Sequence, residues 1–509
     1  MLAAIRSASV LGIDAIDITV EVDVVPGLPA WTIVGLASNA VKEARERVSA
    51  ALANSGFDVP SRRVTVNLSP ADVRKEGTSF DLPIALALLC ATGSLDAATI
   101  DGLIVAGELG LDGSIRPIRG ALSIARAASR TKSCLVIPEA NVAEATLAGN
   151  ARIAPATTLT SLVMQLRNAG PNLPCVSAPD RTRERSDSGD VLDFADVAGQ
   201  ATAKRALEIA AAGGHNVIMM GPPGTGKTML ARRLAGILPP LTEDELLEVV
   251  AIHSVGGLIV PGTIPSHTPP FRAPHHTISL GGLIGGGPGP RPGEVSLAHR
   301  GILFLDELLE LPRHILDAMR QPLEDGRVVI ARAAHAVAFP ARFQLIAAAN
   351  PCKCGHSLNK DSRCKCSMHD IERYRSRLSG PLADRIDLHV HVGTVDISAL
   401  GSAKNEELSA AIRKRVTAAR ARQRERYVPL GGVRTNADVP GRWLLEHAGV
   451  TTEARSQLEA ASERLGISAR AFHRALRVAR TIADLDGDAT VGPSTIAEAL
   501  QYRPIGTGT

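Results

Sequence analysis

Short, mostly apolar runs in the middle of the chain predict buried parallel strands. They cover Val217–Met220, Ile302–Leu305 and Phe343–Ala349, and glycine, acidic residues or asparagine follow them directly. The first run is followed by Met229–Leu238, a stretch typical of a helix. Strands that alternate with helices predict an α/β core with a parallel sheet.

The region before this core predicts an α+β unit over residues 1–168. Apolar and acidic side chains alternate along Ile13–Val24, as in a strand with one face in water. The stretch Asn39–Ala53 has apolar residues at helical spacing. Further expected elements are strands at Val64–Leu68, Leu103–Gly107 and Cys134–Ile137 and helices at Asp81–Leu89 and Ala121–Ala128.

Composition separates the remaining segments. Residues 169–190 are rich in proline, serine, aspartate and arginine and lack periodicity, which predicts a flexible linker before a core at 191–395. Residues 396–440 form a basic helical connector, in which a solvated helix is expected, although Glu406–Arg426 could line a DNA path. Residues 441–509 show three helical patterns that predict a small helical lid.

The loop after the first core strand has the spacing of a phosphate-binding loop. Its residues are Gly221, Pro222, Pro223, Gly224, Thr225, Gly226, Lys227 and Thr228. Glycines let backbone N–H groups turn towards phosphates, and the following helix N-terminus adds its dipole. Lys227 supplies positive charge and Thr228 a hydroxyl for Mg²⁺, so we predict that the chain binds ATP with Mg²⁺.

Acidic and amide side chains follow the other two core strands. Asp306 and Glu307 end one strand, where α/β sheets place their sites. We predict that Asp306 holds Mg²⁺ through water and that Glu307 is the base that polarises the attacking water. Asn350 follows the next strand and would orient that water. A solvated turn is the alternative, but the phosphate loop upstream favours a hydrolytic site.

Overall composition limits the partners. A formal net charge of +4 is too small to indicate nucleic acid by itself, so a DNA contact requires a local basic patch. Aromatic residues make up 3% of the chain, which argues against base stacking as the main grip. We find neither an apolar stretch long enough for a bilayer nor a signal-peptide pattern, and we expect a cytoplasmic protein without a membrane partner.

Four of the seven cysteines form a cluster of Cys352, Cys354, Cys364 and Cys366. Four thiolates suit a tetrahedral Zn²⁺ and leave no open position, which indicates a structural metal. The one-residue gaps are tighter than usual zinc-finger spacing, and reduced free thiols are the alternative. A zinc here would stiffen the chain after Asn350.

The first region resembles the proteolytic domain of Lon-type proteases around Glu76–Ser79 and Gly113–Gly120. By this resemblance, Ser79 falls on the nucleophile position. The serine needs a nearby amine as base, and Leu122 stands where the family has its lysine. We therefore predict a non-proteolytic domain, with a role in binding or assembly, in which Ser79 is an ordinary helix-start residue.

Longer motifs in the core resemble the YifB/ComM-type magnesium-chelatase-like AAA+ proteins. They are Phe271–Thr277 (FRAPHHT), Gly281–Gly287 (GGLIGGG), Pro292–His299 (PGEVSLAH) and Gly380–Asp387 (GPLADRID). The resemblance covers nearly the whole chain. It implies a Lon-like domain, an AAA+ P-loop ATPase core with a C-terminal lid, and a homohexameric ring; these relatives also carry a similar cysteine cluster.

The resemblance implies roles for particular residues. Asn350 matches the sensor asparagine, Arg385 the arginine finger that reaches a neighbouring subunit's γ-phosphate, and Arg470 the second sensor on the lid, pointing back to the nucleotide. A solvated surface charge is the alternative for either arginine. The stretch Ile252–His299 matches an insertion that faces the ring pore. Residues expected to meet DNA phosphates there and in the next hairpin are Arg272, His275, His276 and Arg327, with a metal or structural role for the histidines left open.

Together these features predict an ATP-driven ring motor on single-stranded or branched DNA. It would resemble ComM-type branch-migration helicases, which act in recombination during natural transformation, alongside other recombination proteins. The alternatives are a magnesium-chelatase-like motor subunit, an AAA+ protein-remodelling ATPase and a nucleotide-gated scaffold. The cysteine cluster argues against the chelatase, Leu122 against a protease, and Glu307 with Arg385 against a scaffold.

Overall fold

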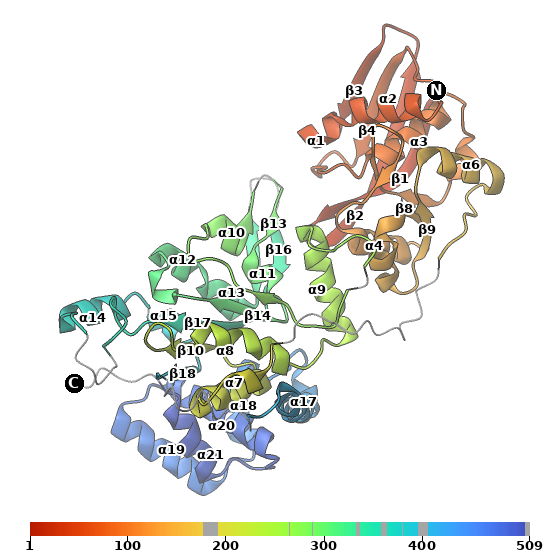
Figure 1. Ribbon diagram of the computed structural model, residues 1–509. Helices are drawn as coiled ribbons and strands as arrows, with labels where there is room; N and C mark the ends of the chain where they lie inside the picture. Colours follow the sequence, from red (N-terminus) through yellow and green to blue (C-terminus); the bar gives the residue numbers. More distant parts are fainter. Residues whose placement is uncertain are drawn as a thin grey trace.

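A computed structural model describes residues 1–176, 192–263, 265–287, 289–331, 336–357, 364–378, 380–394 and 406–503. From residue 177 on, the predicted linker lies outside the described residues, as does the predicted boundary at 395/396. Figure 1 shows the first part of the chain at the upper right, a central α/β body, and the C-terminal helices below that body.

The first part is built on a mixed seven-stranded sheet with the strand order β3-β4-β2-β1-β5-β8-β9. Its strands are β1 (Leu2–Leu11), β2 (Asp14–Val25), β3 (Ala30–Val34), β4 (Arg63–Ser69), β5 (Leu103–Val105), β8 (Cys134–Pro138) and β9 (Arg152–Ala156). Its longer helices are α2 (Ala44–Asn54), α3 (Asp81–Ala91), α4 (Ala121–Arg130) and α6 (Leu159–Ala169). The helix expected over 39–53 is interrupted at Glu43, which separates α1 (Asn39–Lys42) from α2.

Helix α3 is the buried centre of this first unit. All 11 of its residues are buried, as expected for a helix that is apolar on every face. Its one charged residue, Asp81, accepts hydrogen bonds from Arg47 at 2.6 and 2.9 Å, so the buried carboxylate is paired. The N-cap residue of α3 is Phe80, without a side-chain cap, so Ser79 does not cap the helix.

The central body contains a five-stranded parallel sheet with the order β11-β14-β17-β10-β18. The strands are β10 (Val217–Met220), β11 (Phe271–Arg272), β14 (Ile302–Leu305), β17 (Gln344–Ala349) and β18 (Leu388–His391). The three predicted core strands are confirmed. Strands β11 and β18 were not predicted, because β11 has only 2 residues and the 4 residues of β18 include two histidines, which interrupt the apolar run.

Helices and a hairpin surround this sheet. The helices include α7 (Ala201–Gly213), α8 (Lys227–Leu234), α9 (Glu243–Gly256), α10 (Leu280–Ile284), α11 (Glu294–Leu297), α12 (Arg313–Ala318), α13 (Arg320–Asp325), α14 (Met368–Arg375) and α15 (Gly380–Ala383). The hairpin consists of β15 (Arg327–Ala331) and β16 (Ala336–Pro340). Helix α9 also packs against α4 of the first unit, which joins the two parts.

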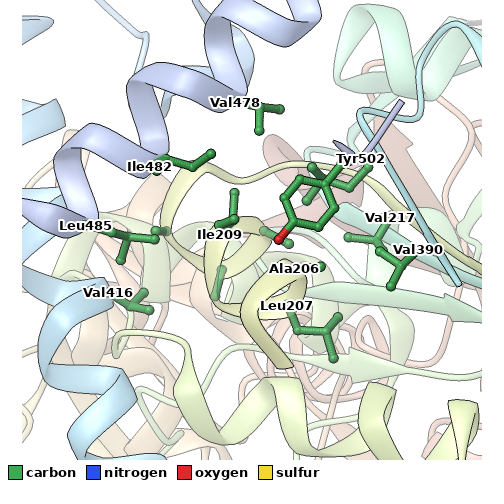
Figure 2. Packing of buried hydrophobic residues seen from close by; sticks show 14 of the residues in the cluster. Ala206, Leu207, Ile209, Val217, Val390, Val416, Val478, Ile482, Leu485 and Tyr502 are labelled. Atoms are coloured by element: carbon green, nitrogen blue, oxygen red, sulfur yellow. The ribbon is translucent and has the colours of Figure 1, made fainter. Parts of the chain in front are cut away.

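The C-terminal helices share one hydrophobic core with the sheet. They are α17 (Ser409–Arg426), α18 (Gly441–His447), α19 (Thr452–Leu465), α20 (Ala469–Asp486) and α21 (Pro493–Gln501), so the region from 441 holds four helices where three were expected. Figure 2 shows Val478 and Ile482 of α20 beside Ile209 of α7, with Val217 and Val390 of the sheet nearby. In the described part of the chain, no helix has the length and apolarity to cross a membrane.

Candidate nucleotide site

The phosphate loop and the predicted residues that follow the core strands meet at the carboxyl ends of those strands. Gly221 follows β10, Asp306 follows β14 and Asn350 follows β17. These strands are neighbours in parallel register, with Met220 opposite Ala349 and Leu305 opposite Ala347. Their carboxyl ends therefore bring the phosphate loop, the acidic pair and the asparagine together.

The phosphate loop (Gly221–Thr228) turns on two glycines. Gly224 and Gly226 have φ values of 77° and 84°, a region that side chains other than glycine rarely occupy. Gly221 lies so close to the backbone of Val392 that a Cβ atom would not fit. Helix α8 begins at Lys227, so its free N–H groups point into the loop.

Lys227 is held inside the loop. Its Nζ donates to the backbone oxygens of Gly221 and Pro222, both at 2.7 Å, and lies 3.4 Å from Asn350 Oδ1. Burial lowers the pKa of Lys227, and the charges of Asp306 and Glu307 oppose that shift. The ammonium group can thus exchange carbonyl partners for phosphate oxygens at the centre of the site.

Thr228 and Asp306 form the oxygen pair expected for Mg²⁺. Thr228 Oγ1 donates to Asp306 Oδ2 at 2.7 Å, and the Glu307 backbone N–H donates to Asp306 Oδ1 at 2.9 Å. Hydroxyl and carboxylate oxygens are ligands that Mg²⁺ accepts, directly or through water. The donor set fits the ion, and Thr228 belongs to the phosphate loop itself.

Glu307 has a partner that the sequence did not predict. Its carboxylate Oε2 lies 3.2 Å from His276 Nδ1, and about half of the Glu307 side chain is exposed. The His276 ring in turn contacts the His275 ring, with ring centroids 4.1 Å apart and the ring planes tilted by 33°. His276 follows β11, the strand beside β14, so it reaches Glu307 across neighbouring strand ends. Nothing in the local sequence links two residues 31 positions apart.

Arg385 lies at the amino-terminal end of the parallel strands, whereas the phosphate loop lies at their carboxyl-terminal end. It precedes β18, and its backbone oxygen accepts from Asn216 Nδ2, which precedes β10, at 2.8 Å. Its guanidinium contacts Glu324 of α13, and Arg385 lines a cavity of about 540 Å³ at this end of the sheet. The structure therefore does not bring Arg385 to the phosphate loop of its own chain.

Arg470 lies beside the segment of Arg385. Its Nη1 is 3.4 Å from Asp384 Oδ2, and 77% of its side chain is exposed. The next arginine along α20, Arg474, is buried and donates to the backbone oxygens of Ala383 and Ile386. Helix α20 thus holds Arg470 beside Asp384, the residue that precedes Arg385.

The cysteine cluster has the dimensions of a four-thiolate zinc site. The Sγ atoms of Cys352, Cys354, Cys364 and Cys366 all lie within 4.8 Å of one another. Three Sγ–Sγ distances are 3.4, 3.8 and 3.6 Å. Four sulfurs at Zn–S distances of 2.3 Å in a tetrahedron would be about 3.8 Å apart, so the residues fit the ion.

Several residues expected to contact DNA have partners within the chain. Arg272 forms two hydrogen bonds of 2.7 Å with Glu294, and His276 contacts Glu307. Most arginines of the basic helix α17 donate hydrogen bonds to residues of other segments that pack against this helix. Arg413 donates to Gly236 O, Arg415 to Glu208, Arg420 to Ala211 O, Arg422 to Asp484 O and Arg426 to Asp484. These contacts stabilise the fold and leave less charge for nucleic acid.

Comparison with known families gives matches along most of the chain. Residues 193–400 match "Magnesium chelatase, subunit ChlI", residues 20–141 match "Subunit ChlI of Mg-chelatase", and residues 406–503 match "Magnesium chelatase, subunit ChlI C-terminal". The first and last of these ranges contain the phosphate loop, the acidic pair and the C-terminal helices.

Individual relatives cover the whole length. "Competence protein ComM" of Haemophilus influenzae is 43% identical over 507 residues, 99% of this chain and 97% of that protein. "Uncharacterized protein YifB" of Salmonella typhimurium is 42% identical over 509 residues, again 99% and 97%. The "Magnesium-chelatase 38 kDa subunit" of Rhodobacter capsulatus is 30% identical over 181 residues, 32% of this chain and 51% of that protein. The parallel sheet, its phosphate loop and these matches identify the chain as a member of the magnesium-chelatase-like AAA+ family that includes ComM and YifB.

Proposed function

We propose that the chain is an ATP-hydrolysing ring motor that acts on DNA, as a branch-migration helicase in recombination during natural transformation. One observation carries the motor part. Lys227, Asp306 and Glu307 lie at the carboxyl-terminal end of the parallel strands, and Arg385 lies at the amino-terminal end. A site that needs all four must therefore be completed by a neighbouring subunit, which favours a closed ring.

The chain's own residues divide the chemistry. Lys227 and the phosphate-loop N–H groups bind and orient the triphosphate. Thr228 and Asp306 would hold Mg²⁺, which supplies charge to the phosphate oxygens when it is bound. Glu307 accepts the proton of the attacking water, Asn350 orients that water, and Arg385 of the adjoining subunit meets charge that develops in the transition state. Arg470 lies beside Asp384, so we assign it to the same neighbouring site.

The DNA part of the proposal rests on the relatives. ComM of Haemophilus influenzae carries the name "Competence protein", and its similarity extends over 99% of the present chain. The magnesium-chelatase subunit of Rhodobacter covers only 32% of the chain. This difference in coverage favours a DNA motor over a chelatase subunit.

The test compares three candidate activators of hydrolysis. Single-stranded or forked DNA should stimulate ATP turnover, whereas a porphyrin with Mg²⁺, or an unfolded protein, should not. Stimulation should weaken steeply as salt increases, because phosphate contacts release counterions. Glu307→Gln should still bind nucleotide but lose turnover by about 100-fold or more. Turnover that responds to porphyrin and ignores DNA would contradict the proposal.

We also propose that the cysteine cluster holds one structural Zn²⁺. The sulfur distances support a closed four-thiolate site. Metal analysis of the purified protein should give about one equivalent of zinc per chain. Less than half an equivalent would contradict this assignment.

A further inference from the structure

The cysteine cluster lies directly against the phosphate loop. We propose that the cluster braces this loop, so that a metal held by the four cysteines and a nucleotide held by the loop strengthen each other's binding. The inference rests on the metal and nucleotide sites of the proposed function. It adds a coupling between them that neither site requires by itself.

The direct contact is between Gly355 and Pro223. Gly355 lies between the two cysteine pairs and has a φ of 84°. A Cβ atom at Gly355 would lie 2.6 Å from Cδ of Pro223, which is closer than packed carbon atoms approach. The Gly355 N–H donates to Cys352 O at 2.9 Å, so the turn that touches the phosphate loop is closed on a cysteine of the cluster.

A second connection runs through the end of β17. Gly221, the first residue of the phosphate loop, donates its N–H to Ala349 O at 3.2 Å. Asn350 Oδ1 accepts from Lys227 Nζ at 3.4 Å. Cys352 follows Asn350 by two residues and is fully buried. Both ends of the phosphate loop therefore contact the segment that leads into the cluster.

These contacts imply a coupling free energy. A bound cation displaces the thiol protons and holds the four sulfurs around one centre, which fixes the cluster. A fixed cluster restricts Pro223 and Asn350, so less freedom is lost when the phosphate loop closes on a nucleotide. Because linkage is reciprocal, a bound nucleotide must increase the affinity for the metal by the same free energy.

The first experiment uses the full-length protein with its zinc content measured. Affinity for a fluorescent ATP analogue with Mg²⁺ is compared before and after removal of zinc by a zinc-selective chelator. We expect the nucleotide affinity to fall on the order of tenfold when zinc is removed, and nucleotide to raise the zinc affinity, measured by equilibrium competition with a metal-sensitive dye, by a similar factor. Equal nucleotide affinities with and without zinc, and equal zinc affinities with and without nucleotide, would overturn the coupling. A protein that contains zinc but binds no nucleotide in either form would contradict the proposed function itself.

The second experiment alters the contact without touching a cysteine. Gly355→Ala places a methyl group against Pro223 and should weaken nucleotide binding on the order of tenfold while zinc content stays the same. Gly56→Ala is the control, because Gly56 has a similar φ of 78° but no atom within 4 Å of an added Cβ. Gly355→Ala combined with Pro223→Ala removes the opposing Cδ and should recover part of the affinity lost by Gly355→Ala alone. Equal nucleotide affinity in Gly355→Ala and Gly56→Ala would overturn the brace.

Discussion

At the scale of single residues, the contact between His276 and Glu307 is central to the proposed chemistry. Glu307 has a φ of 51°, unusual for a residue with a side chain, and its carboxylate lies 3.2 Å from His276 Nδ1. A general base works only when its oxygen reaches the water it deprotonates. His276 restricts the carboxylate to one region of the site, and we treat it as a positioning residue.

Replacing His276 should therefore affect turnover more than binding. We expect His276→Ala to lower kcat for ATP by about tenfold with little change in nucleotide affinity, because Glu307 remains but samples more rotamers. His276→Asn keeps a donor near the carboxylate and should recover part of the loss. Steady-state kinetics with a separate binding measurement distinguish the two effects. An unchanged kcat in His276→Ala would remove the positioning role.

A second residue, His389 of β18, should make stability depend on pH. Burial and nearby Arg474 lower its pKa from 6.5 to about 4, and its Nε2 is buried without a hydrogen-bond partner among the described residues. Between these pH values the unfolded chain binds a proton that the folded chain does not. Stability should thus be complete above pH 6.5 and fall by about 3 kcal/mol as the pH decreases to 4.

The measurement is urea unfolding at pH 7 and pH 4.5. His389→Asn cannot titrate and should lose less stability between these pH values than the wild type. His314→Asn, at an exposed position, serves as the control and should follow the wild type. If His389→Asn shows the same acid-induced loss as wild type, His389 is not its source.

The residues of the site differ in how far the sequence could predict them. Lys227 and Thr228 were predictable because one short segment carries strand, loop and helix signals. Asp306 and Asn350 were predictable because each comes directly after an apolar run, where a buried strand ends. The partners His276 and Glu324 were not predictable, because they reach Glu307 and Arg385 through folding of distant segments. The resemblance to the family suggested that Arg470 belongs to the nucleotide site, but it did not predict the contact of Arg470 with Asp384.

At the scale of elements, helix α9 joins the first unit to the ATPase body. Leu122 of α4 is fully buried in an apolar cluster with α9, which includes Leu246 and Val250. Near it, the Gly120 N–H donates to Ser254 Oγ of α9 at 2.7 Å. The position where a Lon-type protease has its lysine is thus part of the contact between the two units.

Truncation of Leu122 should loosen this contact. Leu122→Ala removes buried methyl groups and should destabilise the protein by about 3 kcal/mol, with increased hydrogen exchange in α4 and α9. Leu111→Ala is a matched control, because the Leu111 side chain is largely exposed. Equal stability of the two variants would show that Leu122 does not stabilise the docking.

Element prediction succeeded where apolar spacing was regular and failed where it was not. The strands β10 and β14 were predicted at their observed bounds, and α3 at its first residue. Strand β1 (Leu2–Leu11) was missed because Arg6 and serines interrupt its apolar residues, although it pairs with β2 along its length. Long-range pairing, rather than local pattern, determines such strands.

At the scale of the whole molecule, the separation of the site residues between the two ends of the parallel strands predicts how subunits assemble. Lys227 and Glu307 lie at the carboxyl-terminal end of the strands and Arg385 at the amino-terminal end, so a complete site requires two chains. Lys227→Ala and Arg385→Ala should each be inactive alone. When mixed before assembly, about a quarter of the seams would join an intact phosphate loop to an intact Arg385, and ATP turnover should return to about that fraction.

The matched control is a mixture of Lys227→Ala with Glu307→Gln. These two defects lie on the same side of every seam, so no arrangement of subunits restores a complete site, and turnover should stay at background. Activity in the first mixture and none in the second would place Arg385 across the seam. Equal failure of both mixtures, with subunit exchange demonstrated by a labelled chain, would mean that Arg385 does not complete the neighbour's site, and the ring mechanism would lose its structural basis.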